Sequence, residues 1–177
     1  MITVNLQGSI SVRHQDEANL VATYRHFVIV VVGHQPMTAM GQQAQCDSCN
    51  AHGRRTGEGK LIEIVLLDPE VALPSGEVRT ILDGNVPIIT PYYACVATLF
   101  EASGFRASII RGLLTSFSLL SRTSFPQKLF SDPNAAASYI AGHQELIAPS
   151  DRLTPEEILD LIANVREIAK REGVLSA

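Results

Sequence analysis

The sequence has few of the features that mark secreted or membrane proteins. It contains only three cysteines, an odd number, and no cleavable apolar leader at its start. This favours a reducing compartment over a disulfide-stapled secreted fold. The longest apolar run near the start, Phe27 to Val32, is far too short to cross a bilayer. We therefore expect a cytoplasmic protein without a membrane span.

The common motifs of catalysis and phosphate binding are also missing. There is no GxSxG, P-loop or GxGxxG, and the stretch GRRTGEG lacks the strand-to-helix context that a phosphate-binding loop needs. No HxxxH or HExxH spacing occurs among the histidines, which are dispersed at positions 14, 26, 34, 52 and 143. We therefore expect no enzymatic activity and no cofactor.

A strong net charge is absent as well. The formal charge is -4 and the pI is about 5.7, so the chain as a whole does not attract nucleic acid. What the chain does have is a globular composition, with 46% hydrophobic and 18% charged residues. Its 177 residues are enough for one domain with a real core and one appended element.

Segments typical of strands and helices alternate along the chain. The runs ISVRH, LVATY and FVIVVV predict antiparallel pairing at the start of a sheet, and the last reads as a strand covered on both faces. The alternation that follows predicts an α/β sandwich with a mixed, mostly parallel sheet. Residues 52–60 read as a solvated connection, and Pro87 as the end of a helix. Further strands are expected at 60–68, 92–101 and, as an edge strand, 125–130, with helices at 38–51, 75–86, 103–121 and 131–142.

The clearest local pattern lies near the end of the chain. Thr154 is an N-cap candidate, Pro155 suits the first helical position, and Glu157 follows the cap by three residues. Apolar residues then recur at helical spacing, which predicts an amphipathic helix over residues 154–172. Its apolar stripe has to be covered by the domain or by another chain, so we expect a homodimer formed through this helix.

The order of elements resembles the STAS domain of bacterial anti-sigma-factor antagonists. The stretch ATLFEASGFRASIIRGLLTSFSLLSRTSFPQKLFSDPNAAASYI looks more specifically like uncharacterised STAS-like bacterial proteins, several of them from myxobacteria. The resemblance covers roughly residues 9–141. It implies a STAS-like α/β domain over 1–143, a linker over 144–153 and an appended helix over 154–172.

The resemblance implies a non-enzymatic regulatory module that docks on a protein partner. Some members are switched by phosphorylation within an Asp-Ser-Ser/Thr-Gly pattern where the middle strand meets its helix. Here Asp68 ends the strand, but residues 69–74 intervene before Ser75 and Gly76, so only Ser75 matches the acceptor. A phosphate at Ser75 would be favoured by the helix N-terminus. The simpler interpretation, which we favour, is that the Ser75 hydroxyl caps the helix.

Two further groups of residues are candidate sites. Cys46, Cys49 and His52 are spaced three apart and would share one side of a helix, as zinc ligands could, but a fourth ligand is missing nearby. We therefore favour a structural role for them, and Cys95 is expected in the core. Near the start of the apolar helix, Arg106 and Arg111 could hold an anion or an acidic partner. The simpler interpretation, which we favour, is that Arg106 forms an ion pair with Glu101.

Two functional hypotheses follow from these observations. The first is a regulatory module that binds a protein partner or itself through its surface. The second is a carrier or sensor of a small hydrophobic ligand, because a STAS-like sheet is similar in layout to the lipid-binding CRAL-TRIO domains. In that case the apolar helix from Phe105 to Leu120 would line the pocket.

Overall fold

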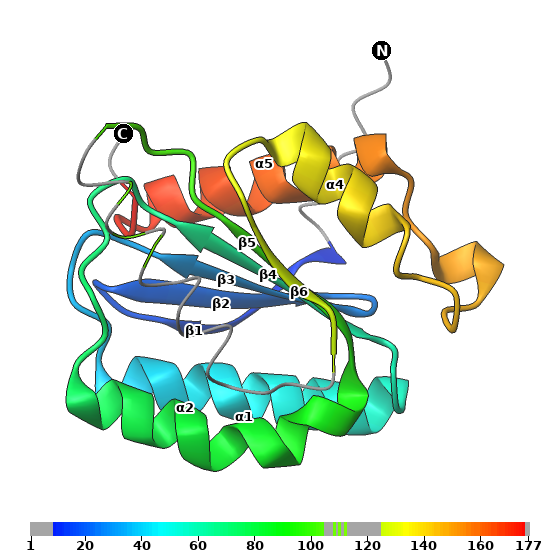
Figure 1. Cartoon of the computed structure of the whole chain (residues 1–177), viewed down its shortest axis with the longest axis horizontal. Helices are drawn as coiled ribbons and strands as arrows, with labels where there is room; N and C mark the ends of the chain where they lie inside the picture. The colour runs from blue at the N-terminus through cyan, green and yellow to red at the C-terminus, as the bar shows by residue number, and fades with distance from the viewer. Residues whose placement is uncertain (1–8, 105–107, 109, 111, 113–124, 176–177) are drawn as a thin grey trace.

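The computed structural model describes residues 9–104, 108, 110, 112 and 125–175. They form one six-stranded sheet in the order β1-β2-β3-β4-β5-β6, with helices on both faces (Figure 1). The first three strands pair antiparallel and β3 to β6 pair parallel, which confirms the predicted α/β class and the mostly parallel sheet. The strands are β1 Ser11–Gln15, β2 Asn19–Tyr24, β3 Phe27–Val32, β4 Leu61–Leu67, β5 Tyr93–Leu99 and β6 Gln127–Phe130.

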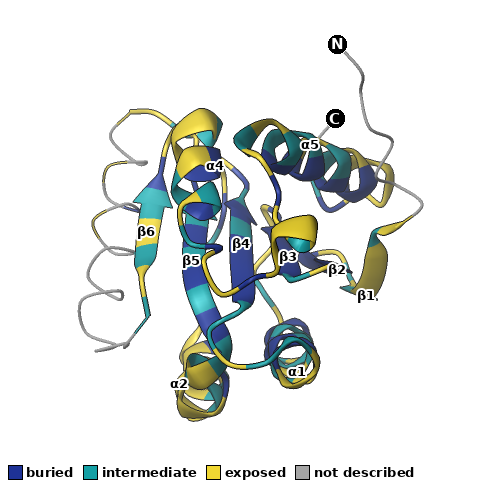
Figure 2. Cartoon of the chain, turned by 90° about the vertical axis from the view of Figure 1, so that its right-hand side faces the viewer, coloured by how far each residue is buried: buried dark blue, intermediate teal, exposed yellow. Residues whose placement is uncertain are grey.

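The helices divide into two pairs. α1 (Ala39–Thr56) and α2 (Gly76–Ile89) lie on one face of the sheet, and α4 (Pro133–Ala141) and α5 (Pro155–Arg171) on the other (Figures 1 and 2). α1 and α2 each connect two parallel strands in a sheet that advances in one direction, so right-handed crossovers place both on the same face. β1 and β6 form the two edges of the sheet, and this confirms the edge strand predicted at 125–130 from its proline. Of the predicted apolar helix at 103–121, Ser103 and Gly104 are described and not helical, and Ser108, Ile110 and Gly112 are described and helical. The other residues of this predicted helix lie outside the described part of the chain.

The alternation of side chains along the strands builds a core on each face. In β3, Ile29 and Val31 belong to the cluster beneath α4 and α5, whereas Val28 and Val30 belong to the cluster beneath α1 and α2. Every residue of β3 is buried, so the prediction of a strand covered on both faces is confirmed. Cys95 lies fully buried in the first cluster, where a core residue was expected.

The amphipathic helix predicted near the end of the chain is confirmed as α5. Thr154 Oγ1 accepts from the Glu157 N–H, and the Glu157 carboxylate accepts from the Thr154 N–H, which completes a capping box. The apolar stripe of α5 is buried in the same core as the sheet strands, so this chain covers the stripe by itself and the reason for expecting a dimer disappears. The buried stripe consists of Ile158, Leu161, Ile162, Val165, Ile168 and Ala169.

The segment 144–153, expected as a linker, is held by side-chain hydrogen bonds to its own backbone. The Gln144 side chain accepts from the Leu153 N–H at 2.9 Å and donates to the Leu153 carbonyl at 2.8 Å. Arg152 donates to the carbonyls of Ile147 and Glu145 at 2.8 and 2.7 Å. These bonds fix the path from α4 to α5. No helix among the described residues has the length and apolarity needed to cross a membrane.

Two predicted helix ends are wrong. The first helix does not stop at residue 51 but continues through part of the expected 52–60 connection to Thr56, whose hydroxyl donates to the His52 carbonyl at 3.0 Å. Its last turn is helical because His52 and Gly53 are buried against the domain. The chain leaves the helix at Gly57, which has a φ of 95°.

The second helix was expected to end before Pro87 but runs on to Ile89. A proline inside a helix removes one N–H and crowds the carbonyl four residues earlier, here that of Asp83. Two contacts offset this loss. Ile89 is buried in the core, and the Thr90 hydroxyl donates to the Val86 carbonyl at 2.6 Å.

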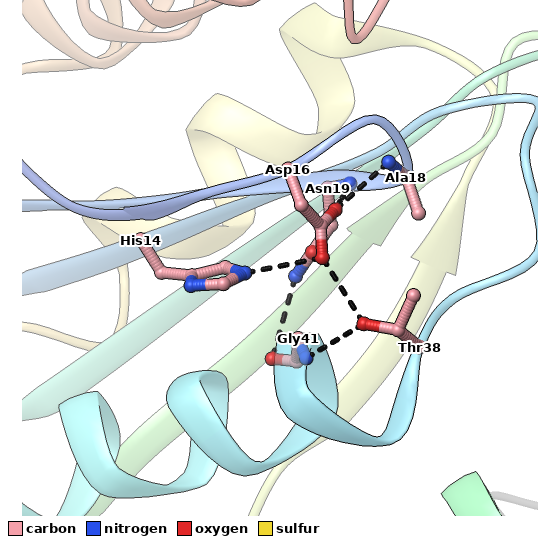
Figure 3. A network of polar contacts seen from close by, with 6 residues as sticks. All are labelled: His14, Asp16, Ala18, Asn19, Thr38 and Gly41. Atoms are coloured by element: carbon pink, nitrogen blue, oxygen red, sulfur yellow. Dashed lines mark hydrogen bonds and ion pairs between the residues drawn. The ribbon is translucent and has the colours of Figure 1, made fainter.

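The turn between β1 and β2 is joined to the start of α1 by a polar network (Figure 3). One carboxylate oxygen of Asp16 accepts from the N–H groups of Ala18 and Asn19, both at 2.8 Å. The other accepts from the Thr38 hydroxyl at 3.0 Å, and Thr38 Oγ1 in turn accepts from the Gly41 N–H at 2.9 Å. One carboxylate therefore fixes both a hairpin turn and the N-cap of a helix.

Candidate ligand-binding pocket

A large pocket opens on the face of the sheet that carries α1 and α2. Its volume is about 860 Å³, and the described residues around it come mainly from β4, β5, β6, α1, α2 and the loop before α2. Val32 of β3, Met37 and Ile110 also contribute to the wall. Most of the wall is aliphatic: Val65 and Leu67 come from β4, Val96 from β5, and Val78 and Leu82 from α2. The charged residues at the wall are mostly exposed, with one exception, Glu63.

Glu63 is a buried acid in the middle of β4. Its Oε1 accepts from Gln45 Nε2 at 2.7 Å and from the Cys49 thiol at 3.6 Å. Its Oε2 accepts from the Tyr93 hydroxyl at 2.7 Å. Gln45 is itself oriented by Gln42, whose Nε2 donates to Gln45 Oε1 at 3.2 Å. A chain of uncharged donors thus converges on one carboxylate at the pocket wall.

Three elements bring these side chains together. Glu63 shares the α1 and α2 face of β4 with Leu61 and Val65, because alternate residues of a strand point the same way. The register shifts between Leu61 and Ile62, and Tyr93 is the β5 partner of Leu61, close to Glu63 on the same face. α1 places Gln45 and Cys49 one turn apart above them.

The electrostatics of this group are dominated by burial. Removal from water raises the pKa of the Glu63 carboxyl, although the hydrogen bonds from Tyr93, Gln45 and Cys49 oppose the rise. Burial also raises the pKa values of Tyr93 and Cys49, and the nearby Glu63 charge adds to both rises. Tyr93 and Cys49 are therefore protonated hydrogen-bond donors at neutral pH, and Cys49 lacks the thiolate character of a nucleophile.

The sequence reasoning missed Glu63. The available signal was a single acid inside the otherwise apolar strand LIEIVLL, since a charged side chain at a position that reads as core has to be paired or functional. Its partners could not be identified in the same way. Gln45, Cys49 and Tyr93 lie 18, 14 and 30 residues away in the chain.

The CxxC and histidine group predicted on α1 divides between two environments. Cys46 and Cys49 are buried free thiols, and Cys49 contacts Glu63. The His52 side chain contacts other groups: its Nε2 lies 2.7 Å from the Arg25 carbonyl oxygen, and its Nδ1 lies 2.9 Å from the Arg55 guanidinium. Both ring nitrogens are thus engaged within the protein. The described part of the chain contains no group of three or more His, Cys, Asp or Glu side chains arranged to hold a metal ion.

Ser75 lies at the exposed N-terminus of α2. Its Oγ accepts from the Val78 N–H at 3.3 Å, so the predicted N-cap is confirmed. Gly76 follows as the first helical residue. Asp68 is buried after β4, where its carboxylate accepts from the Glu70 N–H at 2.7 Å, and it therefore shapes the start of the loop.

A second, more polar hollow lies where β4 and β5 end. It has a volume of about 530 Å³ and includes Asp68, Glu101, Arg166 and Lys170 in its wall. Glu101 forms an ion pair with Arg166 of α5. The expected partner was Arg106. Arg106 and Arg111, the candidate anion-binding residues, lie outside the described residues.

Comparisons with known proteins leave the site to be interpreted from its own chemistry. Searches with this chain against protein-family models, curated proteins and solved structures find no match.

Proposed function

We propose that this chain is a non-enzymatic module that binds a small, largely hydrophobic molecule in the pocket beneath α2. The observation that carries the proposal is the pocket of about 860 Å³, lined mostly by aliphatic side chains with a few buried polar side chains, Gln42, Glu63 and Tyr93, at its wall. Ligand sites in proteins typically have volumes of about 300–1,000 Å³ and combine an apolar lining with a few placed polar groups.

Energetic considerations support an occupant. Apolar surface left facing water forfeits roughly 25 cal/mol for each square ångström, so an open aliphatic pocket is a loss that a hydrophobic molecule would recover. The position of Ile110 also supports the proposal. This residue of the predicted apolar helix is buried and contributes to the pocket wall, as expected for a carrier or sensor.

A neutral, environment-sensitive dye tests the proposal. The chain has no tryptophan, so fluorescence of N-phenyl-1-naphthylamine can be followed without interference from indole. We expect the full-length protein to bind this dye, and Val65→Phe, which fills the pocket, to weaken dye binding severalfold. The matched control is Val12→Phe on the exposed edge strand β1, which lies outside the pocket wall. Equal dye binding by both variants would reject the pocket as the binding site.

Native mass spectrometry of the protein as purified is the complementary measurement. A retained non-covalent adduct that is present on wild-type protein and reduced on Val65→Phe would identify the natural ligand by mass. If wild-type protein carries no adduct and also fails to bind the dye, the carrier proposal is wrong.

A second candidate function is the protein-binding regulatory module that the STAS resemblance implies. The observation in its favour is that exposed Ser75 caps α2, the helix that also forms one wall of the pocket. A ligand in the pocket and a modification at Ser75 would then act on the same helix. In this form the module would be a sensor whose surface responds to the pocket.

A pair of substitutions separates charge from capping at Ser75. Ser75→Asp and Ser75→Asn both keep a good N-cap, and only the first adds a negative charge. A regulatory role predicts that partner capture from the native host differs between Ser75→Asp and wild type, whereas Ser75→Asn behaves like wild type. Identical partner sets for all three proteins would reject the switch.

A further inference from the structure

We propose that the polar end of the ligand is a hydrogen-bond donor, a protonated amine in its best-fitting form, and that Glu63 receives it. This inference rests on the proposed function and specifies the chemical class of the molecule that the pocket holds. The class is an amphiphile with an apolar body and a cationic head, as distinct from a fatty acid.

The direction of the hydrogen bonds around Glu63 is the first argument. A carboxylate offers about four acceptor positions. Oε1 uses two of them for Gln45 and Cys49, and Oε2 uses one for Tyr93. One acceptor position therefore remains on Oε2, and Glu63 forms part of the pocket wall. A hydrogen-bond donor on the ligand would fill this last acceptor position. An acceptor on the ligand would instead place its own lone pairs against Glu63 Oε2.

The charge of the site is the second argument. The hydrogen-bond partners of Glu63 in the described part of the chain are all uncharged. A buried ion without a partner of opposite charge loses hydration free energy, which a cation placed against it restores in part. A protonated amine supplies both the missing charge and the missing donor. A carboxylate head would place a second negative charge beside the first.

The charges at the pocket mouth define the competing arrangement. Arg79 and Lys128 are exposed residues of the pocket wall, and so is Asp83. An anionic ligand would place its head near these cations and only its tail inside. Its affinity would then depend on Lys128 and be indifferent to Glu63, the reverse of what the proposal predicts.

Three probes with the same tail and different heads distinguish the two arrangements. Decylamine, decanol and decanoate are each used, below their aggregation concentrations, to displace N-phenyl-1-naphthylamine from the full-length protein near pH 7. We expect the amine to bind most tightly and decanoate most weakly. Glu63→Gln should weaken amine binding on the order of tenfold, the effect of losing one charge-assisted contact, and leave decanol almost unchanged.

A second variant guards against a folding defect in Glu63→Gln. Tyr93→Phe removes one donor from Oε2, so the preference for the amine over decanol should be retained or increased. Lys128→Gln serves as the control at the mouth and should leave amine binding no weaker than in wild type. Circular dichroism and thermal unfolding report whether each variant is folded.

The outcomes are distinguishable. If the dye binds but decanoate competes as well as the amine, or Glu63→Gln weakens all three probes equally, the donor-head inference is wrong and the hydrophobic pocket stands. If decanoate binds best and loses affinity in Lys128→Gln, the anionic arrangement is correct. If neither the dye nor any probe binds, the proposed function and this inference both fail.

Discussion

Tyr93 donates a 2.7 Å hydrogen bond to Glu63 from a neighbouring strand 30 residues later in the chain. The bond connects two buried groups whose pKa values are both raised, because burial disfavours their charged forms. It also joins β4 and β5 by side chains on the face where the pocket lies. The pocket wall and the sheet therefore share a polar contact whose ionisation should be measurable.

The raised pKa of Glu63 predicts a pH-dependent stability. Folding tightens proton binding relative to the unfolded chain, where the ordinary glutamate pKa is 4.5. The contribution of Glu63 to stability is therefore complete below pH 4.5 and is lost as the pH rises through the raised pKa of the folded state. Urea unfolding of wild type and Glu63→Gln over a pH series measures it. The variant should gain stability relative to wild type across this window, and parallel curves would contradict the prediction.

The lowered pKa of His52 predicts a pH dependence of stability opposite in sign to that of Glu63. Burial, followed by the charge of Arg55, lowers the pKa of His52 from 6.5 to about 4, despite the hydrogen bond to the Arg25 carbonyl. The unfolded chain then binds the proton more tightly, so this contribution is complete above pH 6.5 and is lost as the pH falls towards 4.

His52→Gln tests this prediction, because glutamine keeps one donor and one acceptor but does not titrate. The unfolding free energy of wild type should fall more steeply than that of His52→Gln between pH 6.5 and pH 4. A difference between the two proteins that is constant over this range would show that His52 titrates normally in the folded state.

Two helical glycines should respond oppositely to alanine. A Cβ on Gly53 of α1 would lie 2.5 Å from the Tyr92 ring, so Gly53→Ala should destabilise the fold by about 1–3 kcal/mol. A Cβ on Gly84 of α2 would meet nothing within 4 Å, so Gly84→Ala should stabilise it by about 0.5–1 kcal/mol. Chemical denaturation of both variants gives the comparison. A stable Gly53→Ala would mean that α1 does not approach Tyr92 this closely.

The capping box of α5 should make a measurable contribution to stability. Thr154→Ala removes the acceptor for the Glu157 N–H and should lower the unfolding free energy by about 1 kcal/mol. Thr154→Ser retains the hydroxyl and serves as the control. Thermal unfolding of the two variants should differ, and a Thr154→Ala protein as stable as Thr154→Ser would argue against the cap.

Features with a local cause could be predicted from the sequence. The N-caps at Ser75 and Thr154 follow from residues within one helical turn, and the buried strand at 27–32 follows from an unbroken apolar run. The passage of α2 through Pro87 could not be predicted. It depends on Ile89 being buried in the tertiary structure, which outweighs a local breaker.

In the pocket, too, some features have a local cause and others depend on the tertiary structure. Glu63 was visible in the sequence as an acid within an apolar strand, but its significance comes from Gln45 on a helix and Tyr93 on the next strand. Their convergence depends on the strand pairing and on the register shift near Leu61, neither of which is encoded by a short motif. The fold class was therefore predictable, whereas the site required the assembled tertiary structure.

The position of α5 constrains the order in which the chain can fold during synthesis. This helix buries the apolar face of strands that leave the ribosome more than a hundred residues earlier, since β3 spans Phe27–Val32 and α5 spans Pro155–Arg171. Until α5 has been translated, that face of the nascent sheet lacks the cover that α5 gives to β3 and would be a target for chaperones. Synthesis of this late helix is thus the step that protects the core beneath it.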